Sequence, residues 1–473
     1  MKNILRNIAV GAGLISACMA QAQNLNSAYF LDGYVYGHEL NPAKDYERKG
    51  YVSIPLLGNI NMEKTGNLAF TDVFMLNNSG KLSLFMHPDF TLEQALEGIS
   101  ANNKFNVDMR LDLLGAGFHA WGGFNTINIT SRTNVGFKAP YSLFEAAKEL
   151  GNKDYDISGV GTTATSWVEI GFGHSRQFGQ AVRLGAKVKI LLGAGRANLN
   201  VENARLNLES PDKWIVTANA EADVSLKGFT WGEMETKEYK DPTRGTYEQI
   251  NFSNVDVKNP SVSGGGLAFD LGGEWDLGKQ GWVKGLKVSA SLLDLGFIAW
   301  TETHRAYNNG EDFVFEGFKD IQIEDGPGTP MKEQTHSFAD RLSDLYSLQA
   351  GETGKSTSML GATFNVGVEY EMPFYDKMSV GLLSTTRIQG GYSWNEERFS
   401  CTVSPLKWLE GSVNFGIGSF GPSFGWVANI HPKGFNIFVG MDHTMGKFTK
   451  QGIPMGKNTG FTLGINIPFG KKI

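Results

Sequence analysis

Cysteine is almost absent from this chain, which holds only Cys18 and Cys401 in 473 residues. If an N-terminal signal peptide is removed, Cys401 alone remains, so no intrachain disulfide can support the fold. Beyond residue 22 there is also no run of about 20 apolar residues, so a membrane-spanning structure would have to be made of strands. The net charge of −6 leaves no basic stripe to neutralise phosphates, which argues against a nucleic-acid partner.

Motifs for catalysis and metal binding are also missing. The eight histidines are scattered, with no His-x-x-x-His pair and no cysteine cluster, which argues against a metal site. Gly416 to Gly421 match the dinucleotide fingerprint by letter, but no helix follows them to bind a phosphate. Asp294, in an apolar strand, is interpreted as a luminal hydrogen-bonding group and not as an acid–base catalyst. Without a serine nucleophile elbow either, the sequence predicts neither an enzyme nor a cofactor.

Glycine and aromatic residues are abundant instead. The chain has 59 glycines and 12% aromatic residues against 19% charged residues, a composition typical of many short strands joined by tight turns. No break in composition divides the chain into ordinary soluble domains. We therefore expect a single all-β unit.

The C-terminal residues 459–469 alternate strictly between apolar and small or polar side chains. A strand with this pattern shows one face to an apolar medium and the other to a polar one. Near the end of an exported chain, it predicts a closed antiparallel transmembrane β-barrel of the outer membrane. We expect the last strand to pair with the first, because closure satisfies every backbone donor and acceptor within the lipid. The apolar positions are Phe461, Leu463, Ile465, Ile467 and Phe469.

Ionisable residues occupy the polar side of several expected strands. Within residues 105–113 and 181–193 they alternate with apolar residues, and a basic group facing lipid near the midplane would cost ~2 to 4 kcal/mol. We therefore predict that they face the lumen. The luminal candidates are Asp108, Arg110, Asp112, Arg183, Lys187, Lys189 and Asp294.

Alternation and β-rich composition predict about sixteen strands. If the first strand runs outward, the short connections, including residues 209–212, all fall on the periplasmic side. The long ones, such as residues 227–260 and 301–356, all fall on the other side. Nothing in a soluble β-sandwich requires short and long connections to alternate along the chain. This order therefore favours a membrane barrel. The expected strands are residues 51–60, 105–113, 124–137, 160–174, 181–193, 199–208, 213–226, 264–277, 284–300, 358–371, 378–388, 394–403, 408–417, 422–431, 435–443 and 459–469.

Short helices are expected in two extracellular loops. Thr91 and Gln94 form a capping box before one apolar stripe, and Ser142 and Glu145 form a second capping box after Pro140. Whether these helices pack on the barrel mouth or line a ligand entrance stays open.

Tryptophans are expected in two interfacial girdles. Trp214, Trp282 and Trp408 are placed near the inner ends of their strands. Trp300 and Trp394 are placed near the outer ends. Taken singly, each is also consistent with an ordinary packed aromatic.

The N-terminus predicts export. Residues 1–22 have the charge, apolar run and small-residue site of a signal peptide, with cleavage before Gln23. A lipoprotein box ending at Cys18 is the alternative, and it would leave that cysteine acylated. Residues 23–49 then precede a barrel of residues 50–473. Within them, Pro42 indicates a turn at Asn41 to Ala43, because proline fixes φ and lacks a backbone donor. On these residues alone, a luminal plug and a periplasmic tail remain equally open.

Four stretches together resemble a domain-of-unknown-function family of Bacteroidetes outer-membrane proteins. They are residues 29–43, which end in HELNPA, residues 51–58 (YVSIPLLG), residues 294–300 (DLGFIAW) and residues 464–470 (GINIPFG). The resemblance covers nearly all of the expected mature chain, and the family has no settled activity.

More distantly, the sequence looks like the FadL-type transporters of hydrophobic compounds and the PorV-type barrels of the type IX secretion system. The first resemblance implies fourteen strands and an N-terminal hatch inside the barrel, whose Asn-Pro-Ala turn would be Asn41, Pro42 and Ala43. The basic ligand-site residues of those transporters cannot be placed on this chain.

Two functions are expected from these observations. The first is a plugged outer-membrane barrel that binds or passes a small hydrophobic molecule. The alternative is a docking or secretion-accessory barrel that binds a secreted or surface protein through its long loops. In that case Phe338, Leu342, Leu345 and Tyr346 would form a helical docking stripe. The sequence specifies neither the cargo nor the oligomeric state.

Overall fold

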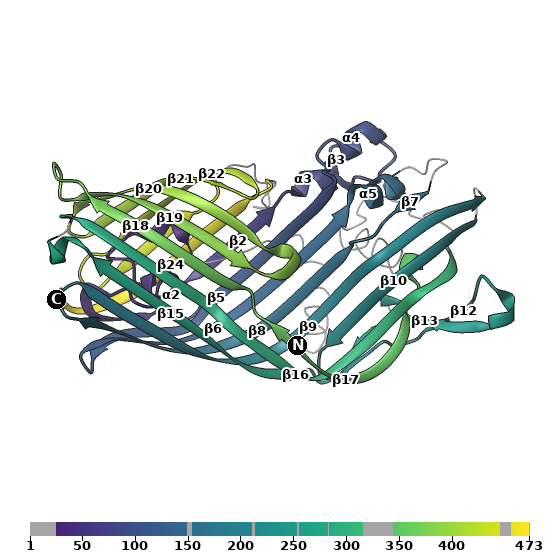
Figure 1. Ribbon diagram of the computed structural model, residues 1–473, viewed down its shortest axis with the longest axis horizontal. Coiled ribbons are helices and arrows are strands. Elements are labelled where there is room, and N and C mark those ends of the chain that lie inside the picture. The colour runs from purple at the N-terminus through teal and green to yellow at the C-terminus, as the bar shows by residue number, and fades with distance from the viewer. Residues whose placement is uncertain are drawn as a thin grey trace.

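The computed structural model describes residues 25–148, 154–210, 213–252, 255–281, 283–315, 344–444 and 456–472. These residues form a closed antiparallel β-barrel of 14 strands (Figure 1). The predicted fold class is therefore confirmed. The signal peptide, with Cys18, lies outside the described residues.

Several wall positions are built from two consecutive pieces of chain. Three positions hold two pieces each: β1 (Arg48–Ser53) and β2 (Ile60–Gly66), β10 (Lys213–Ser225) and β15 (Gly264–Asp276), and β17 (Gln349–Met359) and β18 (Ala362–Glu371). The other positions hold one strand each. These strands are β5 (Asn102–Ala120), β6 (Gly123–Pro140), β8 (Gly161–Phe178), β9 (Val182–Ser210), β16 (Leu286–Phe315), β19 (Met378–Ile388), β20 (Trp394–Leu406), β21 (Leu409–Gly418), β22 (Gly421–Ile430), β23 (Asn436–Met441) and β24 (Thr459–Lys472), and the positions follow one another around the ring in chain order except that β15 shares the position of β10.

The last strand closes the barrel on the first. Val52 of β1 pairs with Ile467 of β24, and Met62 of β2 pairs with Phe461. The predicted alternation holds, because Phe461 and Ile467 are exposed while Asn466 is buried. Pairing of β24 with both pieces of the first position leaves no open edge at this seam.

The predicted count of about sixteen strands was too high by one hairpin. Residues 181–193 and 199–208 were expected to be separate strands, but both belong to β9. Gly193 pairs with Trp167 and Gly195 pairs with Ser166, so Ala194 is an extra residue that interrupts the alternation. Small residues at this bulge gave the sequence the appearance of a turn.

The second surplus strand comes from a divided wall position. β10 and β15 both pair with β9 on one side and with β16 on the other. Between the two pieces, residues 226–252 and 255–263 lie outside this wall position. As a result, the connection of residues 209–212 joins the outer ends of β9 and β10, and its predicted place on the periplasmic side was wrong.

The two ends of the barrel differ. One end, at the left of Figure 1, carries only short connections, and we call it the short-turn end. The other end, the loop end, carries α3, α4 and α5 and the projecting hairpin of β12 (Glu235–Glu238) and β13 (Thr246–Gln249). The short connections are residues 121–122, 179–181, 277–285, 372–377, 407–408 and 431–435.

Short helices do occur in the loops at the loop end. Thr91 caps α4 (Leu92–Leu96) in a capping box with Gln94, as predicted. The second predicted box was wrong, because α5 (Tyr141–Lys148) begins before Ser142, whose hydroxyl donates to the carbonyl of Asp156. No helix within the described ranges is long and apolar enough to cross a bilayer.

Minor elements complete the described chain. They are η1 (Asn26–Ala28), α2 (Gly37–Leu40), α3 (Phe70–Val73), β3 (Phe74–Leu76), β4 (Leu82–Leu84), β7 (Tyr155–Asp156), β11 (Phe229–Thr230), β12 (Glu235–Glu238), η2 (Pro242–Arg244), β13 (Thr246–Gln249), β14 (Asp256–Val257), η4 (Gly278–Gln280) and η5 (Gly390–Tyr392).

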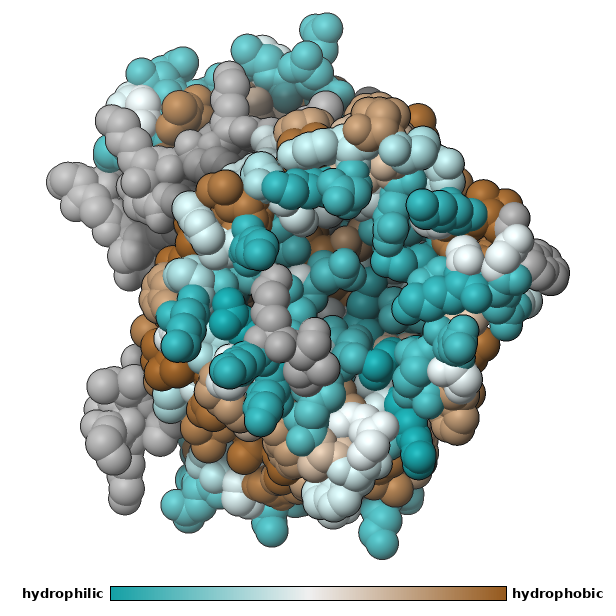
Figure 2. Space-filling model, turned by 90° about the vertical axis from the view of Figure 1, so that its left-hand side faces the viewer, coloured by the Kyte–Doolittle hydropathy of each residue, from teal (hydrophilic) through white to brown (hydrophobic). Residues whose placement is uncertain are grey.

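The outer surface of the barrel carries an apolar belt. On β9, the outward-facing Leu184 and Val188 are 49% and 42% exposed, whereas Lys187 between them is 1% exposed. Figure 2 shows the short-turn end, with hydrophilic side chains across its centre and hydrophobic side chains around the rim. An apolar exterior around a polar interior is the arrangement that a membrane barrel requires.

The polarity of the wall reverses toward the loop end. Past the bulge in β9, Ala204 and Leu206 are buried inside, and Asn203 and Arg205 are exposed outside. The buried side chains belong to a large apolar cluster that also includes residues of β10, β16, α4 and α5. We call it the outer core. The outer parts of β9, β10 and β16 therefore have the polarity of a water-soluble sheet and not that of a membrane wall.

The predicted tryptophan girdles were largely wrong. Trp408 is exposed at the short-turn end, as expected, but Trp214 lies buried in the outer core. Trp300 and Trp394 are also buried. Trp282 lies outside the described residues.

Candidate functional site in the barrel lumen

The N-terminal segment, residues 25–47, lies within the ring of strands toward the short-turn end, where α2 is visible in Figure 1. Every residue from Leu25 to Lys44 is buried except Asp32. The backbone N–H groups of Asn26 and Ser27 each donate to the Asp442 carboxylate over 2.6 Å. Noncovalent contacts of this kind hold the segment, since Cys401 is a free cysteine.

The predicted Asn-Pro-Ala turn lies against the barrel wall. Asn41 Oδ1 accepts a hydrogen bond from Ala43 N over 2.9 Å, and Asn41 Nδ2 donates to the carbonyl of Gly273 over 3.2 Å. A Cβ atom at Gly185 would lie 2.1 Å from the Pro42 carbonyl oxygen. The wall therefore needs glycine where the turn approaches it. That the turn belongs to a movable hatch stays a prediction.

Glu39 of the segment lies between two cations of the wall. Its Oε2 is 2.9 Å from Arg110 Nη2 on β5, and its Oε1 accepts a hydrogen bond from Lys187 Nζ on β9. The next residue along the chain toward the N-terminus, His38, lies 2.7 Å by its Nε2 from the hydroxyl of Tyr51. The segment thus brings a carboxylate into the centre of the lumen.

Asp294 is the centre of the charged groups of the wall. Lys189 Nζ lies 2.6 Å from its Oδ1, and Arg132 Nη2 lies 3.2 Å from its Oδ2. Its backbone N–H donates to Asp270 Oδ1 over 2.7 Å. Arg387 approaches from β19 at 3.8 Å. Because these residues come from β6, β9, β15, β16 and β19, the ion pairs cross the lumen as well as following the wall.

Six of the seven predicted luminal residues are buried in this one charge network. Asp108 joins it through Arg387, at 3.9 Å, and Asp112 joins it through Arg110, at 3.4 Å. Arg183 lies apart, at the margin of the N-terminal segment, where it pairs with Asp45. Whether these residues bind a ligand stays a prediction.

Sequence reasoning missed five members of the network. A charged side chain in the inward register of a predicted strand is the signal that could have found the four on the wall. Glu39 gave no such signal, because its segment has no strand periodicity. The missed residues are Glu39, Arg132, Glu169, Asp270 and Arg387.

The β19–β20 turn, residues 389–393, makes a second set of contacts across the lumen. Gln389 Nε2 donates to Asn134 Oδ1 on β6 over 2.7 Å, and Tyr392 Oη donates to the Gly161 carbonyl on β8 over 3.3 Å. Neither β6 nor β8 neighbours β19 or β20 in the wall, so the turn bridges the lumen. Burial raises the pKa of Tyr392 above its usual value, which keeps the phenol protonated as a donor.

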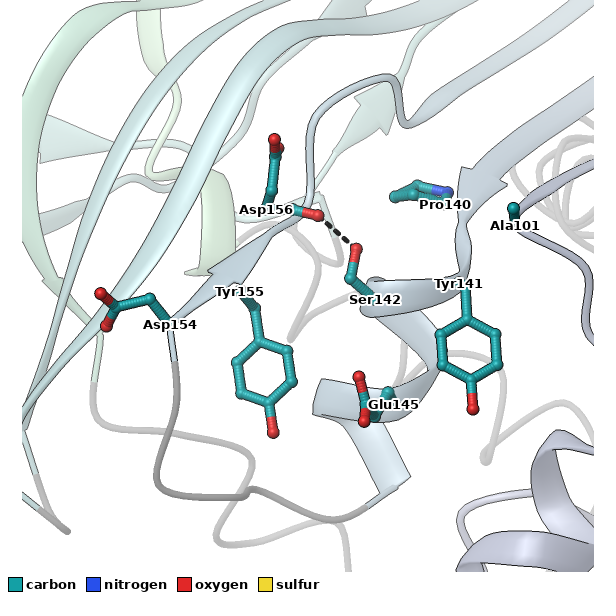
Figure 3. Close-up of a pocket in the computed structure, with 8 residues that line it drawn as sticks. All are labelled: Ala101, Pro140, Tyr141, Ser142, Glu145, Asp154, Tyr155 and Asp156. Carbon is teal, nitrogen blue, oxygen red and sulfur yellow. Dashed lines mark hydrogen bonds between the residues drawn. The ribbon is translucent and has the colours of Figure 1, made fainter.

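A hollow of 340 Å³ opens beside α5 at the loop end (Figure 3). Tyr141, Ser142, Glu145 and Tyr155 are among its lining residues, and the Ser142 hydroxyl donates to the Asp156 carbonyl. α5 thus borders a surface hollow and also buries Leu143 and Phe144 in the outer core.

The predicted docking stripe is only partly described. Phe338 and Leu342 lie outside the described residues. Leu345 and Tyr346 are 1% and 0% exposed and pack into the outer core, so they present no surface to a partner. Within the described part of the chain, no three His, Cys, Asp or Glu side chains are placed to hold a metal ion.

Several solved barrels are similar to this chain over nearly its whole length. A TodX deltaS2S3 mutant monoaromatic hydrocarbon channel is 9% identical, covers 98% of this chain and 99% of its own, and gives a TM-score of 0.43. The P. putida toluene transporter TodX is 8% identical, with coverages of 97% and 99% and a TM-score of 0.40. A Pseudomonas aeruginosa FadL homologue is 9% identical, with coverages of 95% and 100% and a TM-score of 0.38.

No curated protein matches the chain. A family of unknown function, DUF5723, matches residues 42–442, which include the Asn-Pro-Ala turn's last two residues and most of the barrel wall. With this much of its length matched, the chain belongs to the DUF5723 family.

Proposed function

We propose that this chain is an outer-membrane channel that admits a small hydrophobic molecule from its loop end, with the N-terminal segment acting as a movable plug. The observation that carries this proposal is the reversal of wall polarity between the apolar belt and the outer core. At the loop end, the apolar side chains lie inside the wall, where an apolar molecule arriving from water would find them.

The outer core supplies a driving force for capture. Transfer of apolar surface out of water is favourable by ~25 cal/mol per Å². Phe229, Trp231 and Ile250, from the chain that leaves the wall between β10 and β15, are buried in this core together with side chains of β9 and β10. Small movements of residues 226–252 would open part of this apolar surface to a solute.

Passage farther along the lumen requires two movements. In this proposal the β19–β20 turn, which bridges the lumen, is one closure, and the buried N-terminal segment is the other. Both are held by hydrogen bonds and ion pairs, which can exchange with those of a ligand or of water. The conformation described above is therefore the closed state of the proposed channel.

The location follows from the belt and from the expected signal peptide. The belt fits a bilayer, and the short-turn end has the short connections that bacterial barrels turn toward the periplasm. We assign the loop end to the outside of the cell, so that the plug lies on the periplasmic side.

Dye uptake by whole cells that display the chain in their outer membrane tests this function. Asp442→Ala removes the acceptor of two backbone hydrogen bonds of the segment, so we expect it to raise the uptake of a hydrophobic fluorescent dye several-fold over the unaltered chain. Asp276→Ala is the control, because Asp276 caps a turn at the same end by accepting from Lys279 N. Uptake equal to that of cells without the barrel, for every variant, would refute the proposal.

A further inference from the structure

The short-turn end carries an arc of exposed lysines along one side of its rim. The arc runs from the connection before β19 to the seam where β24 meets β1, and the five lysines on it are exposed. Among the described residues, Asp376 is the one exposed carboxylate in this sector. The sector is therefore positive, although the whole chain has a net charge of −6. We call these residues the lysine arc: Lys49, Lys377, Lys407, Lys433 and Lys471.

Neighbouring connections of the arc are hydrogen-bonded to one another. Ser404 N donates to the Lys377 carbonyl over 2.8 Å, and His431 N donates to the Trp408 carbonyl over 2.8 Å. Arg48 Nη2 donates to the His431 carbonyl over 2.8 Å, which joins the last connection to the seam. Because adjacent strands are ~4.8 Å apart, the lysines of successive connections lie on the order of 10 Å from each other. The arc is thus one continuous surface.

The charge of the arc is largely uncompensated by the protein. Within the part of the chain that the structure describes, Lys407 and Lys433 have no ion-pair partner. Elsewhere on the same rim the situation differs, since Lys279 Nζ lies 3.4 Å from Asp276 Oδ2. Neighbouring ammonium groups repel one another, and an anion between them replaces this repulsion by attraction. The arc therefore has the charge of a surface that binds anions.

The wall beside the arc is apolar on its outer face. Ile430 and Trp408, next to the connections, are 38% and 44% exposed, and Val413 farther along β21 is 51% exposed. Between them Gly411 pairs with Ala428. These two small residues add little bulk to the outer face, so an acyl chain can lie against the wall there. A ligand that covers both surfaces has an anionic head and an apolar tail.

We propose that the lysine arc binds the phosphate groups of anionic phospholipids in the leaflet at the short-turn end, while their acyl chains lie on the outer face of β20, β21 and β22. Charge complementarity specifies the headgroup, and the apolar belt specifies the chains. Free phosphate shares only the chemistry of the headgroup. The inference requires a barrel in a bilayer and not a channel, so failure of the proposed function would leave it intact.

Native mass spectrometry of the full chain in detergent micelles measures lipid binding directly. The chain is mixed with cardiolipin, which carries two phosphates, or with phosphatidylcholine, whose headgroup has no net charge. Since each lysine near anionic headgroups strengthens binding by about 5-fold, we expect cardiolipin to bind at least about 10-fold more tightly. Equal affinities for the two lipids would overturn the proposal.

Competition distinguishes a lipid from a free anion. Inorganic phosphate in excess should leave cardiolipin bound, because the phosphate ion has no acyl chains to place on the wall. Displacement of cardiolipin by inorganic phosphate at unchanged ionic strength would show that the headgroup alone is bound. That result would overturn the assignment to a phospholipid.

Variants assign the binding to the arc. Lys407→Gln should lower the affinity for cardiolipin about 5-fold, and Lys407→Gln with Lys433→Gln should lower it about 25-fold. Lys279→Gln is the matched control, because it removes a lysine from a connection at the same end whose charge is already paired with Asp276. We expect it to change the affinity by less than about 2-fold. Equal losses in Lys279→Gln and Lys407→Gln would contradict a role for the arc.

Unfolding measurements separate lost binding from lost folding. All three altered lysines are exposed, so the urea midpoint of each variant in phosphatidylcholine vesicles should equal that of the unaltered chain. In cardiolipin vesicles the midpoint of the unaltered chain should rise, because a ligand that binds the folded state stabilises it. The double variant should lose this rise. A rise that persists in the double variant would overturn the proposal.

Discussion

Asp294 has a left-handed backbone, with φ at +58°, inside the long strand β16. A side chain other than glycine rarely adopts this conformation, and asparagine and aspartate tolerate it best. The register of β15 and β16 shifts at this point, from Phe269 opposite Leu295 to Leu271 opposite Leu292. The strand accepts the strain here because this bulge directs the Asp294 carboxylate toward Lys189 and Arg132. Removal of the charge without a change in side-chain shape should therefore lower the free energy of unfolding.

Asp294→Asn tests this expectation at the residue scale. The amide keeps the backbone conformation but leaves two buried cations short of a carboxylate, so we expect the free energy of unfolding to fall by ~3 kcal/mol. Asp45→Asn is the control, because the Asp45 side chain is 38% exposed beside Arg183, and such pairs contribute ~0 to 1 kcal/mol. Urea unfolding in lipid vesicles, followed by tryptophan fluorescence, measures both, and equal losses would contradict the central role of Asp294.

The sequence was sufficient for the direction of these side chains but not for their partners. Alternation along β5 and β9 predicted that Arg110 and Lys189 face inward, because a strand has a period of two. Asp294, the carboxylate that Lys189 and Arg132 share, is 105 residues from Lys189 and 162 residues from Arg132. Such pairs follow from the closure of the barrel, which local periodicity does not encode.

At the scale of elements, the β19–β20 turn is held by side chains from the opposite wall. Lys104 Nζ donates to the carbonyls of Gly391 and Ser393, over 3.3 and 3.2 Å. Gly136 leaves room for Tyr392, since a Cβ there would lie 2.8 Å from the ring. The turn is thus held against β5, β6 and β8 by few contacts, and it could move away from them while the wall stays intact.

Tyr392→Ala should loosen this turn without unfolding the barrel. It removes the ring and the hydrogen bond to the Gly161 carbonyl, so we expect more frequent opening and a higher single-channel conductance in planar bilayers. The free energy of unfolding should change by less than about 2 kcal/mol, the usual size for one hydrogen bond and partial burial. Tyr375→Ala, in an exposed turn of the short-turn end, should leave the conductance unchanged. Conductance that is equal in all three chains would count against a gating role.

Element boundaries were predictable wherever alternation was uninterrupted. The last strand agrees closely with expectation, and so does the capping box of α4, whereas β5 (Asn102–Ala120) extends beyond the predicted residues 105–113 at both ends. One of the two surplus strands arose at Ala194, where one extra residue broke the period without a turn. A bulge and a short turn look alike in sequence, because both favour small residues and end an alternation.

At the scale of the whole molecule, the reversal of wall polarity fixes where the bilayer ends along β9. Val188 faces outward within the belt and Asn203 faces outward beyond it, on the same strand. Val188→Arg should therefore hinder insertion into lipid vesicles, by ~2 to 4 kcal/mol if its position is near the midplane. Asn203→Arg should change the folding free energy by no more than about 0.5 kcal/mol, as a substitution on a surface in water. Equal penalties for the two arginines would show that the bilayer covers the outer half as well, and the outer core could then not receive a solute from water.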